Sequence, residues 1–141
     1  MSGWILHLKL MCKISRMNML VTNSSNTRFG TYDGFSTSLL IGESNSGSKE
    51  ISIQITHVDP NRMQSLHSHS QTQCYFIISG KGLMFVDDEA EKVQEGNAIF
   101  VPSNSTHGIQ NIGSDILTYL TANRAFGKLK EEELWPEQRI L

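Results

Sequence analysis

Short strand-like segments separated by turn residues run through the middle of this 141-residue chain, and they constrain its fold more than any other feature. Residues 50–58 alternate isoleucine with polar side chains, as a strand with two different faces does. The next residues, Asp59-Pro60-Asn61, have the composition of a turn. Similar turn signals recur about every 8–12 residues, which is the spacing expected of a β-sandwich or β-barrel. The pattern therefore predicts an all-β fold.

The other predicted strands are also short runs bounded by turn residues, many of them rich in β-branched and aromatic side chains. They are residues 64–69, 73–79, 83–86, 91–94, 98–101, 106–110 and 116–122. A chain of this length fits one domain. We divide it into an N-terminal segment (1–30), a barrel (31–124) and a C-terminal tail (125–141), and we expect only the tail to contain a short helix.

The composition excludes several classes of protein. The formal net charge is −2 with both signs interspersed, so no basic nucleic-acid footprint is present. The two cysteines, Cys12 and Cys74, form neither a disulfide framework nor a thiolate zinc site, which favours a cytoplasmic protein. The apolar stretch at residues 4–11 is short and interrupted by His7 and Lys9, so it predicts neither a signal peptide nor a membrane span.

Three histidines and a glutamine lie near the ends of the predicted strands: His67, His69, Gln73 and His107. Side chains two residues apart on a strand share one face, so His67 and His69 are expected to point the same way. A third histidine from a neighbouring strand can then complete a metal site, because imidazole binds zinc, copper, iron and nickel. A lone histidine is more often structural, and we interpret His57 in that way.

The spacing of these residues resembles the two motifs of the cupin family. The first motif, G-x5-H-x-H-x3-4-E-x6-G, is matched here by Asn61, His67, His69, Gln73 and Gly80. The second motif, G-x5-P-x-G-x2-H-x3-N, is matched by Gly96, Pro102, Asn104, His107 and Asn111. The resemblance covers residues 50–122 and implies a jelly-roll barrel, a double-stranded β-helix of two antiparallel sheets.

The framing residues of the motifs also make a local prediction. Gly80, Gly96 and Asn104 suit turns that need a positive φ, since glycine and asparagine tolerate that region best. Asn61 stands where the family has a glycine and is expected to fill the same conformational role.

The resemblance implies that one divalent transition metal, either Zn, Fe, Mn, Ni or Co, is held by His67, His69, Gln73 and His107. Gln73 replaces the family's glutamate, and a neutral amide oxygen is a weaker donor than a carboxylate. The bound metal would therefore keep more positive charge and favour an anionic ligand, while a possible general base is lost. The alternative is that Gln73 only hydrogen-bonds a metal-bound water.

The parity of the strand around Gln73 predicts the environment of its neighbours. Tyr75 shares the parity of Gln73 and should face the interior, where it could be a catalytic proton donor, line the pocket or only pack. Cys74 and Phe76 should face the opposite way, toward a second layer or a subunit interface. Residues 98–101 are predicted to be core on both faces.

The resemblance leads to a functional prediction with alternatives. The first is a metal-dependent enzyme of the dioxygenase, decarboxylase or isomerase type, acting on a small anionic or oxygen-rich molecule. The second is a non-catalytic protein that binds or senses a small molecule through the metal, and the third is a scaffold with an incidental metal. The family resemblance also implies a homodimer, in which the alternating Leu6, Leu8 and Leu10 could form a strand added to the partner's sheet.

Overall fold

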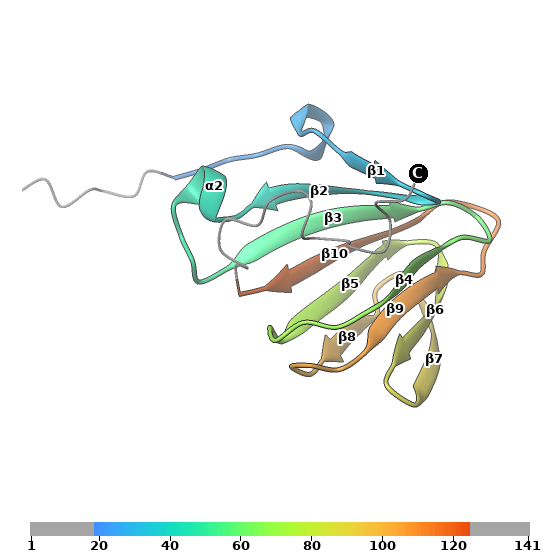
Figure 1. The fold of residues 1–141 in the computed structure, drawn as a ribbon. Coiled ribbons are helices and arrows are strands. Elements are labelled where there is room, and N and C mark those ends of the chain that lie inside the picture. Colours follow the sequence, from blue (N-terminus) through green and yellow to red (C-terminus); the bar gives the residue numbers. More distant parts are fainter. Residues whose placement is uncertain (1–18, 125–141) are drawn as a thin grey trace, which may run out of the picture.

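Two antiparallel β-sheets that face each other make up the fold (Figure 1). A computed structural model of the protein describes residues 19–124. The predicted all-β fold is confirmed, whereas the expected C-terminal helix and N-terminal strand lie outside the described residues. No helix within residues 19–124 is long and apolar enough to cross a membrane.

Six strands form the first sheet, in the spatial order β1-β2-β3-β10-β5-β8. Their bounds are β1 (Gly30–Tyr32), β2 (Phe35–Ile41), β3 (Ser52–Val58), β10 (Leu117–Asn123), β5 (Gln73–Ser79) and β8 (Ala98–Val101). The second sheet has the order β4-β9-β6-β7, with β4 (Met63–His67), β9 (His107–Asn111), β6 (Lys81–Val86) and β7 (Glu89–Gln94). Two short helical segments, η1 (Ser24–Asn26) and α2 (Glu43–Ser46), precede β1 and β3.

The space between the sheets holds an apolar core that also contains hydrogen-bonded polar groups. Its main apolar members are Phe35, Val58, Tyr75, Ile77, Met84, Val93, Val101, Ile109, Leu117 and Tyr119. On β3 the polar residues Ser52 and Thr56 are buried, while Ile51 just before the strand is 47% exposed. The side of the strand that carries Ser52 and Thr56 therefore faces inward, although Ile55 on the opposite side is also largely buried, at 9% exposed. Thr56 is satisfied there because its hydroxyl donates to the Thr37 hydroxyl at 2.9 Å.

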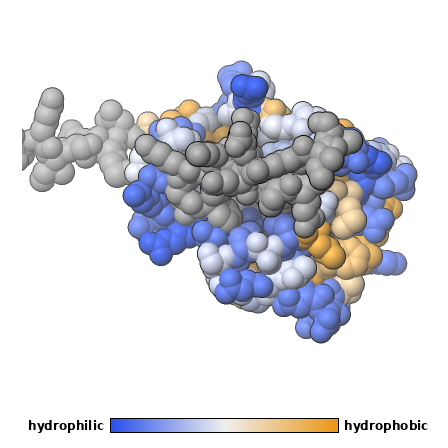
Figure 2. Space-filling view, in the orientation of Figure 1, coloured by the Kyte–Doolittle hydropathy of each residue, from blue (hydrophilic) through white to orange (hydrophobic). Residues whose placement is uncertain are grey.

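The outer face of the six-stranded sheet differs in part from the sequence expectation. Cys74 and Phe76 are exposed, as their parity predicts. Phe100 is 63% exposed and Ala98 is also exposed, so the prediction that residues 98–101 are core on both faces is wrong. A two-layer sandwich covers only one face of each sheet, and β8 is moreover an edge strand. On the side drawn in Figure 2, hydrophilic residues border one apolar area toward the lower right.

The turn predictions hold at all four framing positions. Asn61 and Asn104 have φ values of 61° and 63°, and Gly80 and Gly96 have values of 92° and 86°. At Gly80 a side chain is excluded for a second reason, because a Cβ would lie 2.9 Å from the Cα of Leu117. Glycine and asparagine are therefore required here by backbone conformation, as expected for residues that place strand ends.

We predict that Tyr119→Phe destabilises the fold by about 1–3 kcal/mol, the cost of leaving a buried polar group unsatisfied. The buried Tyr119 hydroxyl donates to Gln64 Oε1 at 2.6 Å, and the variant removes that donor. Urea unfolding measures the change. The double variant Tyr119→Phe/Gln64→Leu serves as control and should recover part of the loss, since no unpaired amide remains. An unchanged unfolding midpoint in the single variant would contradict the prediction.

Candidate metal centre

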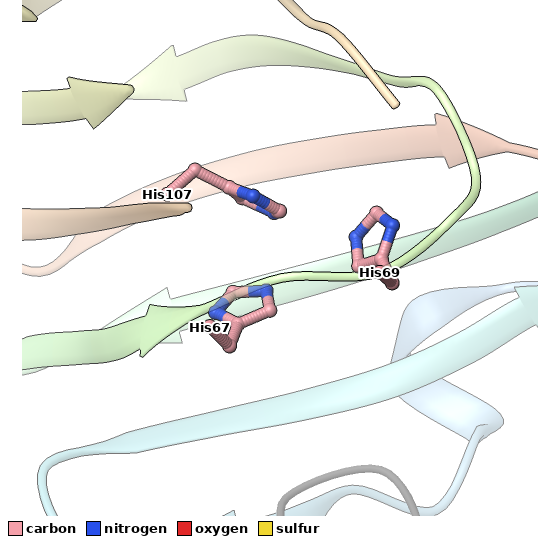
Figure 3. A group of neighbouring side chains, drawn as sticks. All are labelled: His67, His69 and His107. Atoms are coloured by element: carbon pink, nitrogen blue, oxygen red, sulfur yellow. The ribbon is translucent and has the colours of Figure 1, made fainter. Parts of the chain in front are cut away.

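Three histidine side chains converge at one end of the sandwich (Figure 3). His67 is the last residue of β4, His107 is the first residue of β9, and His69 lies in the segment that follows β4. Each offers a ring nitrogen, and these nitrogens all lie within 4.8 Å of one another. His107 is fully buried and the other two are partly buried. The predicted grouping is confirmed, although His69 lies beyond the strand that was expected to carry it.

A β-bulge in β4 turns His67 toward the interior. Gln64 pairs with Ile109, whereas His67 pairs with His107, so β4 contains one more residue than β9 over this interval. Gln64 is buried, but Leu66, which shares its parity, is 47% exposed. The extra residue therefore changes which parity points inward. In a regular strand Leu66 would occupy the interior and His67 would face solvent.

Gly108 on β9 provides the room for this bulge. A Cβ at Gly108 would lie 2.8 Å from the carbonyl oxygen of Gln64 and 3.2 Å from the amide nitrogen of Leu66. Both atoms belong to the backbone of β4 and cannot rotate away. The absence of a side chain at Gly108 thus permits the close approach that places His67 opposite His107.

Hydrogen bonds from backbone amides hold the segments next to His69 and His107. The Asn104 amide donates to the carbonyl oxygen of His69 at 2.8 Å, which joins the loop after β8 to the segment after β4. The Asp87 carboxylate accepts from the Thr106 amide at 2.8 Å, one residue before His107. Asn104 itself lies in a turn, where its φ is positive.

A hydrogen bond from the ring to a backbone carbonyl fixes the tautomer of each of the three histidines. Each ring holds its Nδ1 at 2.8 Å from a backbone carbonyl oxygen two residues away, and these carbonyls belong to Ser65, Gln71 and Ser105. A carbonyl oxygen only accepts, so Nδ1 must carry the proton of the neutral ring. The lone pair then resides on Nε2. Histidines that bind metals are usually held in this way.

Two histidines of the cluster, His67 and His107, are also kept neutral. Burial lowers the pKa of His67 to about 4, against a smaller raising effect of its hydrogen bond to the Ser65 carbonyl. Proximity to His107 and His69 lowers that pKa as well. Burial likewise lowers the pKa of His107. A neutral ring is the form that donates a lone pair to a metal.

Gln73 completes the cluster from the opposite sheet. It is the first residue of β5, is buried, and places its Oε1 at 3.2 Å from Nε2 of His107. With the His107 proton on Nδ1, both of these atoms are acceptors and neither supplies a hydrogen. Two ligands of one ion at about 2.1 Å each lie roughly 3.0–3.4 Å apart for right-angled to tetrahedral geometry. The donor set therefore fits a divalent transition metal shared by His107 and Gln73.

Comparison with known families agrees with this arrangement, since residues 54–123 match the cupin domain. These residues form a cupin domain. An uncharacterized protein of Methanocaldococcus jannaschii is 40% identical over 50 residues, which are 35% of this chain and 40% of that protein. An uncharacterized protein of Streptomyces coelicolor is 26% identical over 68 residues, 48% of this chain and 65% of that protein. The chain thus spans between two fifths and two thirds of these relatives.

Solved structures share the cupin fold. A predicted oxalate decarboxylase from Thermotoga maritima has a TM-score of 0.68 at 19% identity, covering 75% of this chain and 99% of that one. KdgF from Halomonas sp. has a TM-score of 0.67 at 13% identity, covering 83% and 100%. An oxalate decarboxylase variant of Bacillus subtilis has a TM-score of 0.66 at 25% identity, covering 72% and 28%. The first two likenesses establish the fold alone.

Tyr75 lies inside the cupin domain beside the cluster, as its parity predicts. Its ring stands edge to face with His107 at 6.2 Å between centroids, and it contacts Tyr119 at 5.1 Å. Burial raises the pKa of Tyr75 well above that of an ordinary tyrosine. The phenol therefore stays protonated and is a weak acid.

His57 lies outside the cluster, where its Nδ1 is 2.9 Å from the Thr118 hydroxyl, in agreement with a structural role.

A groove of about 480 Å³ opens at the side of the cupin domain between the edge strands β7 and β8. Its apolar part includes Val86, which pairs with His107, and Ile99, which pairs with Tyr75. Its rim carries four acidic residues, Asp87, Asp88, Glu89 and Glu91. This groove could not be predicted from the sequence, because the acidic residues resemble an ordinary hairpin turn and form a rim only when the two sheets meet.

We predict that the metal-free protein shows His67, His69 and His107 as Nδ1-protonated tautomers at pH 8. The three carbonyl contacts require this form, and long-range ¹H–¹⁵N correlation spectra report it directly. His57 is the internal comparison, because a threonine hydroxyl can either donate or accept and leaves its tautomer open. A protonated Nε2 on His107 would refute the proposed lone-pair arrangement.

We also expect Gly108→Ala to destabilise the protein by about 1–3 kcal/mol, the usual range for overpacking. The added methyl group would press on the β4 backbone at the bulge. Thermal or urea unfolding provides the measurement, and the His67 resonances should shift as well. Gly113→Ala is the matched control, because a Cβ there makes only ordinary contacts at 3.5 Å or more. Equal stability of the two variants would show that the close approach is unimportant.

Proposed function

We propose that this protein is a metal-dependent cupin that binds a small oxygen-bearing molecule at a divalent transition metal, either Zn, Fe, Mn, Ni or Co. The ligands would be His67, His69, His107 and Gln73. The observation that carries this proposal is the convergence of three Nε2 lone pairs beside the Gln73 carboxamide oxygen, with no proton available between His107 and Gln73.

Each residue of the centre has a defined task in this proposal. The imidazoles supply neutral nitrogen ligands, and their carbonyl contacts keep them oriented before binding. Gln73 adds an oxygen without adding negative charge, so the centre would retain the full charge of the ion. A metal bound there would supply Lewis-acid activation of a carbonyl or hydroxyl oxygen on the ligand. Tyr75, protonated and buried beside His107, would line the pocket and donate a hydrogen bond to that ligand.

The charge around the centre narrows the class of ligand. The neutral donor set favours an oxygen ligand with negative or partly negative character. The acidic rim of the lateral groove opposes the approach of strongly anionic molecules from that side. An oxygen-rich molecule with at most one negative charge satisfies both conditions. We therefore propose an enzyme of the decarboxylase, isomerase or dioxygenase type for such molecules.

A second candidate, binding or sensing without catalysis, is favoured by the absence of an evident base. Within residues 19–124 the group of candidate ligands includes no carboxylate, and Gln73 cannot accept a proton as a carboxylate would. The raised pKa of Tyr75 also makes its phenol a reluctant acid. Metal-dependent binding of an oxygen-rich compound with turnover would support the enzyme, and the same binding without turnover would support the sensor.

We further propose that the protein forms a homodimer. The outer face of the six-stranded sheet exposes Cys74, Phe76 and Phe100 near its β8 edge, and apolar surface of this kind often marks a subunit contact. Sedimentation at several protein concentrations tests this proposal, and a monomer at every concentration would reject it.

We expect His67→Ala and His107→Ala each to weaken zinc and cobalt binding by at least about tenfold, because each removes one nitrogen ligand. Competition with a chromophoric chelator, after removal of bound metal, measures the affinity. His57→Ala is the control and should bind as the parent protein does, since His57 lies outside the cluster. Unchanged affinity in both site variants would reject the metal assignment.

Gln73→Glu should bind the same metals more tightly than the parent protein, because a carboxylate is a charged and stronger oxygen donor. The same chelator competition applies. Gln71→Glu adds the same charge in the loop after His69 without occupying the position of Gln73, and it controls for long-range attraction. If Gln73→Glu binds no better than Gln71→Glu, Gln73 is not a ligand.

A further inference from the structure

We infer that Asn123 is a positioning residue that orients the Gln73 carboxamide, so that its oxygen rather than its nitrogen faces the histidines. The inference rests on the proposed metal centre. It concerns Gln73, whose side chain ends in both an oxygen and a nitrogen. A carboxamide has an acceptor oxygen and a donor nitrogen of nearly the same shape. Only the oxygen can bind a metal, so the direction of this side chain decides whether Gln73 contributes.

Strand pairing places Asn123 directly beside Gln73. Asn123 ends β10 and pairs with Gln73 on one side and with Ser52 of β3 on the other. Paired residues in an antiparallel sheet point to the same face, and here that face is the interior. Asn123 and Gln73 are each 6% exposed. The contact between the two amides is therefore set by the register of β10 against β5 and is shielded from water.

The direction of both amides follows from a backbone carbonyl. Asn123 Nδ2 donates at 2.7 Å to the carbonyl oxygen of Arg124, which can only accept. The other end of Asn123, its Oδ1, then accepts from Gln73 Nε2 at 3.4 Å. This leaves Gln73 Oε1 pointing at His107 Nε2, 3.2 Å away. One fixed acceptor thus determines the orientation of two side chains in succession.

Without Asn123 the reverse orientation would be the more stable one in the metal-free protein. Gln73 Nε2 would then donate to the lone pair of His107 and occupy the atom that the metal needs. With Asn123 present, that reversal would bring Gln73 Oε1 against Asn123 Oδ1, two buried acceptors without a proton. A glutamate at position 73 would need no such partner, because both of its ends are oxygens. Asn123 is therefore needed only because residue 73 is a glutamine, whose oxygen and nitrogen must be told apart.

The test makes the same substitution at Asn123 in two proteins, the parent protein and the Gln73→Glu variant, and compares their metal affinities. Asn123→Leu removes the acceptor and should weaken zinc and cobalt binding roughly three- to tenfold in the parent protein, as expected for one net hydrogen bond. In the Gln73→Glu protein the same substitution should change affinity by less than about twofold. Ser52→Ala is the control, since Ser52 is buried on the far side of Asn123 and its hydroxyl makes no hydrogen bond in the described part of the chain.

Two results would overturn the inference. One is an equal loss of affinity in both backgrounds, which would indicate a general structural role for Asn123. The other is no loss in the parent protein. If neither the parent nor Gln73→Glu binds metal at all, the proposed metal centre itself fails, and that outcome is distinct from the other two.

A measurement on the unmodified metal-free protein gives an answer even if Asn123→Leu does not fold. The Gln73 side-chain amide protons should show stronger nuclear Overhauser contacts to the Asn123 side chain than to the His107 ring. The opposite pattern would place the nitrogen toward the histidines and refute the orientation.

Discussion

Three hydrogen bonds, each from a histidine Nδ1 to a backbone carbonyl two residues away, determine what the interior of this sandwich can bind. They place the proton of each ring on Nδ1, next to the backbone carbonyl. The Nε2 lone pairs are therefore left to point into the space between the three histidines. Burial supports this state because it lowers the pKa of His67 and His107. The neighbouring Gln73 oxygen then meets His107 as a second acceptor, an arrangement that suits the cation proposed to bind there.

The pairing of β4 with β9 places two of the three histidines, His67 and His107, opposite each other. The bulge changes the inward parity of β4, so that both Gln64 and His67 face the interior although they are three residues apart. Gly108 permits the backbones to approach closely enough. Bulges commonly re-aim a side chain beside a functional site. Here the bulge turns His67 toward the interior. Gln64, before the bulge, also faces the interior, where its Oε1 accepts the hydrogen bond from the Tyr119 hydroxyl.

The donors of the proposed metal centre are all neutral. Its proposed oxygen ligand is the Gln73 amide, which contacts Asn123, and the acidic groups lie outside, at the rim of the groove between β7 and β8. Structural neighbours of this chain carry several different names, among them oxalate decarboxylase and polyketide cyclase. A shared fold therefore does not decide the reaction, and the argument for function depends on the charges and proton positions of the site itself.

The sequence by itself determined the all-β class, the turn conformations at Asn61 and Asn104, and the grouping of the histidines, because these depend on local residue chemistry and on spacing along the chain. It predicted that residues 50–58 alternate, but not that their polar side faces inward. Only the tertiary structure decided which side of residues 50–58 is buried, where β4 bulges, and that Asn123 lies beside Gln73. The physical reason is that these features arise from strand pairing and sheet packing between residues distant in sequence, such as the 50 residues that separate Gln73 from Asn123.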